Sequence, residues 1–155
     1  MKKTSQPKPR AAGKPTGIAY LIGRLDHVLS RRMRDSLLPL GLTVPQYTTL
    51  SFLSTQGQLS NAQLAERSLT SPQSANEMVK MMEGRGWIAR EPDPSHGRII
   101  NIRLTAEGQA LLDRCDIAVA EVEKSMLADM APAEREQLHQ QLRTLVRILS
   151  AVTVY

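Results

Sequence analysis

The sequence predicts a mainly α-helical protein with one small β-hairpin, in the order of a winged helix-turn-helix with further helices on both sides. Two observations predict this fold class. Residues 59–104 contain two short segments of helical pattern and then two segments of strand pattern, which a loop rich in proline and glycine separates. Longer segments with apolar residues at helical spacing precede and follow this stretch.

The first short helix of the motif is predicted by a capping pattern that begins at Ser60. Its hydroxyl can accept a hydrogen bond from the backbone of Gln63, whose side chain can reach back to the Ser60 backbone. Leu59 and Leu64 occupy the two positions around this cap where apolar side chains pack together. The helix should therefore run to about Arg67 and be followed by a short turn.

The second helix of the motif is predicted to begin at Ser71, because serine is a good N-cap and Pro72 suits the first helical position. Its apolar residues recur at i, i+3, i+4 and i+7, so one face packs inward, and glycines at 84 and 86 end it. The other face is polar and can meet base edges and phosphates of DNA. The candidate DNA-binding residues of this helix are Ser71, Gln73, Ser74, Asn76, Glu77 and Lys80.

The hairpin is predicted from two strand-like segments, residues 87–91 and 100–104, of which the second alternates apolar and polar residues. Two prolines and a glycine exclude regular structure in the loop between them. Because this loop is too long for a tight turn, it should project as a wing. We expect Arg98 to enter a narrow minor groove, where the negative potential is enhanced, with Asp93 holding its orientation. The candidate DNA-binding residues of the wing are Asp93, His96 and Arg98.

The chain outside the motif is predicted to be helical, at residues 18–38, from a cap at Thr43 to about residue 55, and over residues 105–152. We expect one domain over residues 18–155, with the winged unit at residues 42–104. The first and the last two helices carry more apolar surface than a small winged unit can cover, so they should pair with those of a second copy. Such a dimer would hold two recognition helices about 34 Å apart, one turn of DNA. A monomeric helical bundle with an appended wing is the alternative.

The net charge of +5 is weaker support for DNA binding than it first looks, because it is unevenly distributed. Residues 1–17 hold five lysines and arginines and no acid, so the remaining residues sum to zero. These first residues are predicted to form a disordered basic arm, which either adds an electrostatic contact or is a solvated tail. The arm lacks the apolar segment of a secretory signal, and no stretch is apolar enough to span a membrane. With Cys115 as its single cysteine, the chain suits the reducing cytoplasm.

An enzymatic function is not indicated. The three histidines, His27, His96 and His139, lie in separate predicted elements, and no pair of them has metal-ligand spacing. The sequence contains no glycine-rich phosphate loop and no nucleophile elbow. We therefore expect no cofactor and no metal, and we expect Cys115 to be a buried packing residue on an apolar helix face.

From about Ile18 to Val152, the chain resembles the multiple-antibiotic-resistance regulator (MarR) family of transcriptional regulators. The order and spacing of five short segments carry the resemblance: Leu40–Thr43, Leu59–Ala65, Glu83–Ile88, Asp93–Arg98 and Leu104–Gly108. The resemblance implies a dimer formed by the first and the last two helices. It also implies pseudo-palindromic DNA sites and, in many members, a small and frequently aromatic effector that releases the DNA.

Two functions therefore remain in view, a DNA-binding regulator and a winged-helix protein-interaction module with weak or no DNA binding. Recognition helices of the family often carry arginine where this chain has Glu77 and Met81. A carboxylate repels phosphates, which favours the interaction module, but it can also accept a hydrogen bond from cytosine N4. We expect a repressor that a small effector, such as an aromatic acid, releases from DNA.

An effector site is predicted along the first helix, where four side chains recur at i, i+4, i+7 and i+11. In the family fold, this region borders a crevice between the dimer helices and the winged lobe. An arginine and a histidine beside a tyrosine could hold a carboxylate while apolar neighbours hold a ring. The alternative is a solvated or salt-bridged face with Asp26 and Asp35 as partners. The candidate effector-binding residues are Tyr20, Arg24, His27, Arg31 and Tyr47.

Overall fold

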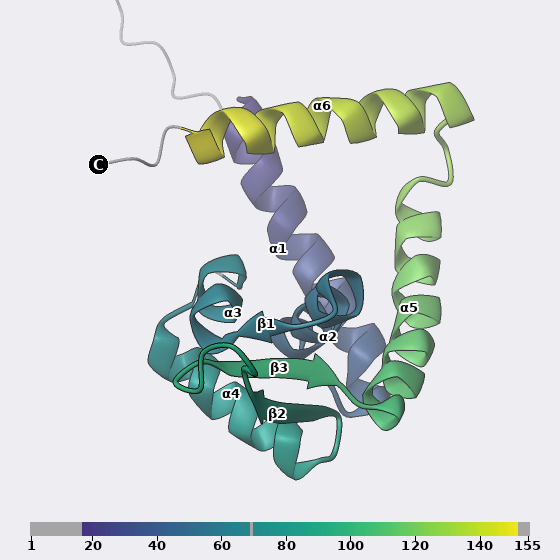
Figure 1. Cartoon of the computed structure of the whole chain (residues 1–155). Helices are drawn as coiled ribbons and strands as arrows, with labels where there is room; N and C mark the ends of the chain where they lie inside the picture. The colour runs from purple at the N-terminus through teal and green to yellow at the C-terminus, as the bar shows by residue number, and fades with distance from the viewer. Residues whose placement is uncertain (1–16, 69, 152–155) are drawn as a thin grey trace, which may run out of the picture.

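The computed structural model describes residues 17–68 and 70–151 and is mainly helical, with one small sheet, as predicted (Figure 1). Most of the predicted basic arm and the last four residues lie outside the described residues. The elements in chain order are α1 (Ile18–Leu37), η1 (Leu38–Leu40), α2 (Val44–Gln56), β1 (Leu59–Ser60), α3 (Asn61–Arg67), α4 (Pro72–Gly84), β2 (Ile88–Pro92), β3 (Ile100–Leu104), α5 (Ala106–Met126) and α6 (Pro132–Ala151).

The predicted caps are confirmed at both helices where a reciprocal cap was expected. At α3, the Gln63 backbone donates to the Ser60 hydroxyl at 3.2 Å, and the Gln63 side chain accepts from the Ser60 backbone at 2.8 Å. At α2, Thr43 and Gln46 make the same pair of bonds. Each cap satisfies backbone groups that the first helical turn leaves without an intrahelical partner, so these helix starts are defined locally.

The sheet differs from the predicted two-stranded hairpin, because a third strand joins it. β1 pairs antiparallel with β3, with Leu59 opposite Ile102, and the strand order is β1-β3-β2. β2 begins one residue later than predicted, since the Trp87 amide donates to the Met82 carbonyl at the end of α4 and is not available to the sheet. β2 also ends one residue later, at Pro92, which the prediction placed in the loop and which needs no amide hydrogen at a strand end.

The core lies between α2, α3, α4, the sheet and the first half of α5, which together form a winged lobe (Figure 1). Leucines of α2 and α3 meet the apolar face of α4 and the inward residues of β2 and β3; the fully buried ones include Leu50, Leu64, Met82, Ile88 and Ile102. Cys115 is also fully buried in this cluster, as predicted for a packing residue.

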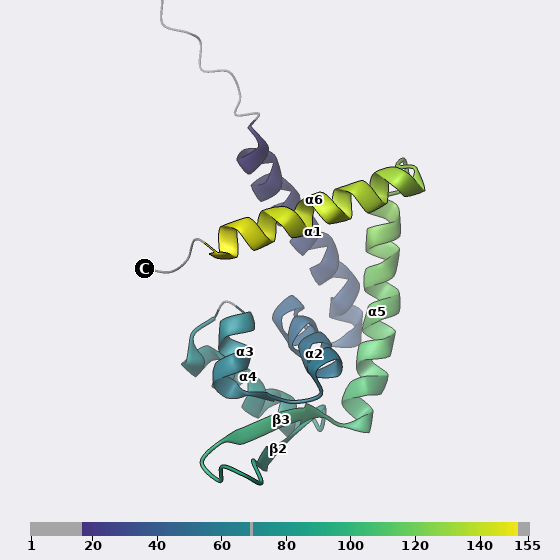
Figure 2. The ribbon, with the colours of Figure 1, turned by 45° about the horizontal axis from the view of Figure 1, so that its top comes forward.

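The N-terminal part of α1 and all of α6 lie away from the winged lobe, at the far end of α5 (Figure 2). None of the α6 residues is buried. Large apolar side chains are exposed on both helices, among them Ile18 at 74 % and Val146 at 65 %. This uncovered apolar surface agrees with the prediction that the terminal helices pair with those of a second copy.

Within the described residues, no helix is long and apolar enough to cross a membrane.

Candidate DNA interface and effector hollow

α4 is held in place by its apolar face, and the residues of that face are the predicted ones. Ala75, Val79 and Met82 are buried, and Met78 packs against the core from its edge. At the helix start, the Ser71 hydroxyl accepts from the Ser74 backbone at 3.1 Å and donates to the Ser74 hydroxyl at 2.9 Å. Both serines are therefore engaged in capping, which leaves their hydroxyls less free for a base or a phosphate than the sequence analysis assumed.

The polar face of α4 remains accessible. Gln73, Glu77 and Lys80 are exposed, whereas Asn76 is half-buried. The Gln73 amide donates to the Glu77 carboxylate at 3.3 Å, one helical turn along. This bond partly satisfies the carboxylate that sequence analysis identified as unfavourable next to phosphates. Lys80 makes no ion pair within the described part of the chain, so its charge is available.

Asn61 has a role that the sequence analysis missed, since it ties α3 to the start of α4. Its side-chain amide donates to the Pro72 carbonyl at 3.1 Å, across the turn of the helix-turn-helix. Asn61 and Pro72 lie eleven positions apart, so no local sequence pattern predicts the bond. It links the first residue of α3 to the first residue of α4.

The wing is organised by the carboxylate of Asp93. It accepts from the backbone amides of Ser95 and His96, at 2.8 and 2.9 Å, and from the side chain of Asn101 at 2.8 Å. These hydrogen bonds, that from Asn101 above all, lower the pKa of Asp93 below its ordinary value. These bonds hold the loop that carries Arg98, and no bond joins Asp93 to Arg98 among the described residues, so the predicted role of Asp93 in orienting Arg98 stays a prediction.

His96 and Arg98 are exposed on this organised loop. The His96 ring lies 3.9 Å from the Asp93 carboxylate at its nearest approach. Arg98 has no ion-pair partner in the described part of the chain. The wing therefore presents a cation on a loop of defined shape.

Other arginines of the lobe are occupied within the fold. Arg90 of β2 pairs with Glu83 of α4, with its Nε 2.8 Å from the carboxylate, and this pairing lowers the pKa of Glu83. Arg103 pairs with Glu91 across the hairpin. Arg85 donates to the Gly41 carbonyl at 3.3 Å and stacks 5.0 Å from the centre of the Trp87 ring. Lys80 and Arg98 are consequently the better candidates for contacts to DNA.

The predicted effector residues are only partly brought together. His27 and Arg31 line one hollow on α1, of about 390 Å³, together with Val28, Arg32 and Asp35. Tyr20 and Arg24 lie nearer the N-terminus of the same helix and do not line this hollow. Tyr47 lies on α2, where its hydroxyl donates to Asp116 of α5 at 2.9 Å.

Arg32 was missed by the sequence analysis, because its position falls outside the i, i+4, i+7, i+11 series. It lines the His27 hollow and also a second hollow of about 520 Å³ between α1 and α5. The apolar part of that second hollow comes from Leu25, Val28, Leu29, Val122 and Met126. The alternative was a solvated or salt-bridged face. Ion pairs of these cations with Asp26 or Asp35 are not seen among the described residues, but a solvated face agrees with the exposure of Arg24, His27 and Arg31.

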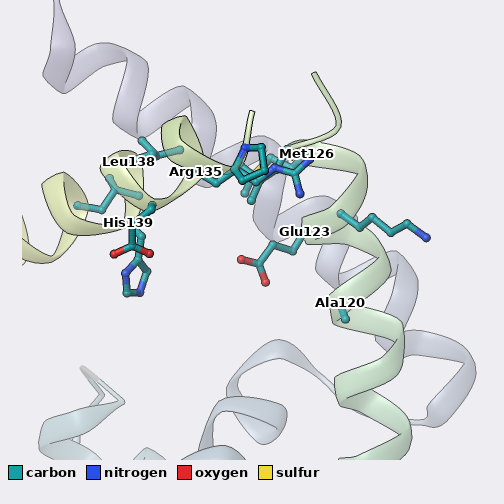
Figure 3. Close-up of a pocket in the computed structure, with 11 residues that line it drawn as sticks. Ala120, Glu123, Met126, Arg135, Leu138 and His139 are labelled. Atoms are coloured by element: carbon teal, nitrogen blue, oxygen red, sulfur yellow. The ribbon is translucent and has the colours of Figure 1, made fainter. Parts of the chain in front are cut away.

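A third hollow, of about 610 Å³, lies in the angle between α5 and α6 (Figure 3). Glu123 of α5 and His139 of α6 point into this angle, and much of its remaining lining is apolar. It is continuous with the exposed apolar surface of α6, so it belongs to the surface that a second copy would cover.

Comparison with known proteins agrees with the geometry of the winged lobe. Residues 42–100 match the MarR family. The chain is 37 % identical over 120 residues to the HTH-type transcriptional repressor Rv2887 of Mycobacterium tuberculosis, covering 77 % of this chain and 86 % of that protein. It is 29 % identical over 105 residues to the transcriptional regulator HosA of Escherichia coli, covering 68 % and 78 %.

Solved structures show the same fold. The structure of Rv2887 in complex with p-aminosalicylic acid has a TM-score of 0.71 at 31 % identity and covers 84 % of this chain and 98 % of that one. Rv2887 has also been solved in complex with DNA and with salicylic acid. A mutant MarR from E. coli has a TM-score of 0.76 at 19 % identity, covering 86 % and 99 %, which supports the fold alone. The extent of the match to Rv2887, together with the match over the winged motif, shows that this chain belongs to the MarR family of transcriptional regulators.

Proposed function

We propose that this protein is a homodimeric transcriptional repressor that binds a pseudo-palindromic operator in double-stranded DNA and is released by a small aromatic acid. One observation carries the proposal. α4 buries its apolar face and leaves Gln73, Glu77 and Lys80 exposed, on a lobe whose wing presents the exposed Arg98. A polar helix face of this kind suits the major groove, and an arginine on a projecting loop suits the adjacent minor groove.

A dimer is supported by the exposed apolar surfaces of α1 and α6. A second copy would remove this surface from water and would present two recognition helices to successive major grooves on one face of the DNA. Because each half-site is then bound by one lobe, the operator should be an inverted repeat.

The effector class is supported by the unpaired cations on α1 and by the ligands of a relative. Rv2887 has been solved with salicylic acid and with p-aminosalicylic acid. In this chain, His27, Arg31 and Arg32 could hold a carboxylate at the hollow on α1, beside the apolar hollow between α1 and α5. Release of DNA requires that the acid bind more tightly to the dimer geometry that does not fit the operator.

The activity proposed is binding rather than catalysis, and it takes place in the cytoplasm, where a bacterial chromosome lies. Membership of a family of transcriptional regulators supports both statements.

A gel-shift titration with the DNA upstream of the protein's own coding sequence, together with selection from a randomised duplex library, tests DNA binding. We expect an inverted repeat bound in the nanomolar range at physiological salt. Binding that does not exceed that of random duplex would overturn the proposal and favour the protein-interaction module.

Calorimetric titration with salicylic acid tests the effector. We expect binding that lowers operator affinity and that Arg31→Ala and His27→Ala each weaken, whereas Arg114→Ala on the exposed side of α5 leaves it unchanged. Binding that persists in both hollow variants would place the pocket elsewhere on the chain.

A further inference from the structure

Two side-chain hydrogen bonds join α2 to α5, and their partners have the same spacing along both helices. The Tyr47 hydroxyl donates to the Asp116 carboxylate at 2.9 Å, and the Ser54 hydroxyl donates to the Gln109 side-chain oxygen at 3.2 Å. Tyr47 and Ser54 are seven residues apart, as are Gln109 and Asp116, and the order is reversed between the helices. Seven residues are two helical turns, so the two bonds lie on one face of an antiparallel helix pair.

The space between the two bonds is apolar. Leu50 and Leu53 of α2 and Leu112 and Cys115 of α5 are buried there in the same core cluster. Apolar packing holds the two helices together but fixes their mutual angle less sharply than a directed hydrogen bond does. The two hydrogen bonds lie at the ends of this apolar contact between α2 and α5, and they add a directional constraint on the angle between the helices.

α5 is also attached to the lobe at its first turn. The Thr105 hydroxyl donates to the Gly86 carbonyl at 2.6 Å, and Gly108 packs so closely that an added Cβ would lie 1.9 Å from the Trp87 carbonyl oxygen. Asp116 lies eight residues beyond Gly108, about 12 Å along the helix axis. Beyond Asp116, α5 continues for about 15 Å to its end at Met126, where it leads to α6 (Figure 2).

We propose that the bond between Tyr47 and Asp116 sets the direction in which α5 leaves the winged lobe, and so selects the distance between the two half-sites of the operator. Among the bonds described, it holds α5 at the point farthest from the first-turn attachment, so a small angular change there moves the dimerisation helices most. Tyr47 is thus a positioning residue for DNA recognition. The inference rests on the proposed function, because it requires a dimer on an inverted repeat.

The chemistry of the pair fits this role. Partial burial, and then the hydrogen bond to Asp116, raise the pKa of Tyr47 to about 12, so its hydroxyl is a neutral donor throughout the physiological range. Tyr47 therefore remains the donor in this bond at physiological pH, as a fixed geometric constraint requires.

The test uses the inverted repeat selected by the unaltered protein, and two further duplexes in which the spacer is one base pair longer or shorter. One base pair moves a half-site by about 3.4 Å and rotates it by about 35°. We expect Tyr47→Phe to keep the fold and the dimer but to lower the preference for the selected spacer by about two- to tenfold. Asp116→Ala should do the same, and the double variant should lower it no further.

Two variants serve as controls. Asp116→Asn retains an oxygen that accepts the tyrosine hydroxyl, so it should keep the spacer preference of the unaltered protein. Thr55→Ala removes an exposed hydroxyl that donates to the Ser51 and Phe52 carbonyls within α2, and it should also keep that preference.

The inference is overturned if Tyr47→Phe and Asp116→Ala discriminate between spacers as well as the unaltered protein, or if Thr55→Ala loses discrimination equally. These outcomes differ from failure of the proposed function, in which the unaltered protein selects no inverted repeat at all.

Discussion

Arg98 stands on a wing whose shape is set by a neighbouring carboxylate rather than by the arginine itself. Asp93 holds the loop backbone, and the Arg98 side chain is exposed without an ion pair in the described part of the chain. Removing the guanidinium should therefore remove a contact to DNA and leave the loop intact.

We expect Arg98→Ala to weaken operator binding by about 1–3 kcal/mol without a change in thermal stability. Fluorescence anisotropy with the selected operator at physiological salt measures the effect. Arg114→Ala removes an exposed arginine from α5 and is the matched control. If Arg98→Ala and the unaltered protein had equal operator affinity, the wing would not be part of the DNA interface.

Asn76 and Lys80 lie one helical turn apart on α4 and should act differently. A half-buried amide can pair with adenine through two hydrogen bonds, so Asn76→Ala should relax the base preference at one position of each half-site. Lys80→Ala should lower affinity for all sequences and reduce the salt slope by about one if its contact is to a phosphate. Selections and titrations at several salt concentrations separate the two effects; no change in either would mean that α4 does not contact the bases.

At the scale of the elements, the first turn of α5 packs closely against the backbone between α4 and β2, at Trp87. Gly108 allows this approach, since an added Cβ would overlap the Trp87 carbonyl oxygen. We expect Gly108→Ala to destabilise the fold by about 1–3 kcal/mol, because backbone on one side must move. Urea denaturation measures it.

Gly23→Ala is the control for that change, because no atom lies within 4 Å of its added Cβ and the residue is in the interior of α1. It should be neutral or should stabilise by up to about 1 kcal/mol. If both glycine variants had the same stability, the close approach of α5 to Trp87 would not be a constraint.

Tyr47 gives the stability of the fold a pH signature at the alkaline end, because partial burial and then the hydrogen bond to Asp116 raise its pKa. The pKa of Tyr47 in the folded protein, about 12, lies above its ordinary value of 10.0. The folded state prefers the neutral form of Tyr47. The stability that this preference contributes is therefore complete below pH 10 and is lost as the pH rises towards 12. We expect the free energy of unfolding to fall less steeply between pH 10 and 12 in Tyr47→Phe than in the unaltered protein or in Tyr20→Phe. Parallel curves for all three would show that folding does not disfavour the ionised form of Tyr47.

At the scale of the whole molecule, the two recognition helices act together only if the exposed faces of α1 and α6 meet those of a second copy. Leu142 lies among the apolar residues where these helices are neighbours, with Ile18 and Leu21 of α1 nearby. A carboxylate there would have to be buried in the dimer, at high cost.

We expect Leu142→Asp to yield monomers by light scattering and to weaken operator binding about 100-fold or more, because the two half-sites are no longer bound by one linked molecule. Ala110→Asp places the same charge on an exposed position of α5 and should remain dimeric. A dimeric Leu142→Asp protein with full operator affinity would show that the dimer uses another surface.

The features that the sequence alone established are local ones. The caps at Thr43, Ser60, Ser71 and Thr105 each involve a partner three residues away, so the pattern of a few residues was enough to place the helix starts. The buried face of α4 followed from helical spacing for the same reason. Together these predicted the winged motif and its recognition helix.

The features that the folded structure added all join residues that are distant along the chain or lie on different elements. β1 pairs with a strand some forty residues later, and Tyr47 bonds to Asp116 across 69 positions. The predicted effector residues separated because helical spacing places side chains on one face without showing which of them line the same hollow. Only His27 and Arg31 do so here, and Tyr47 lies on another helix. Such pairings depend on how whole elements pack, and burial of apolar surface, which drives that packing, is not directional.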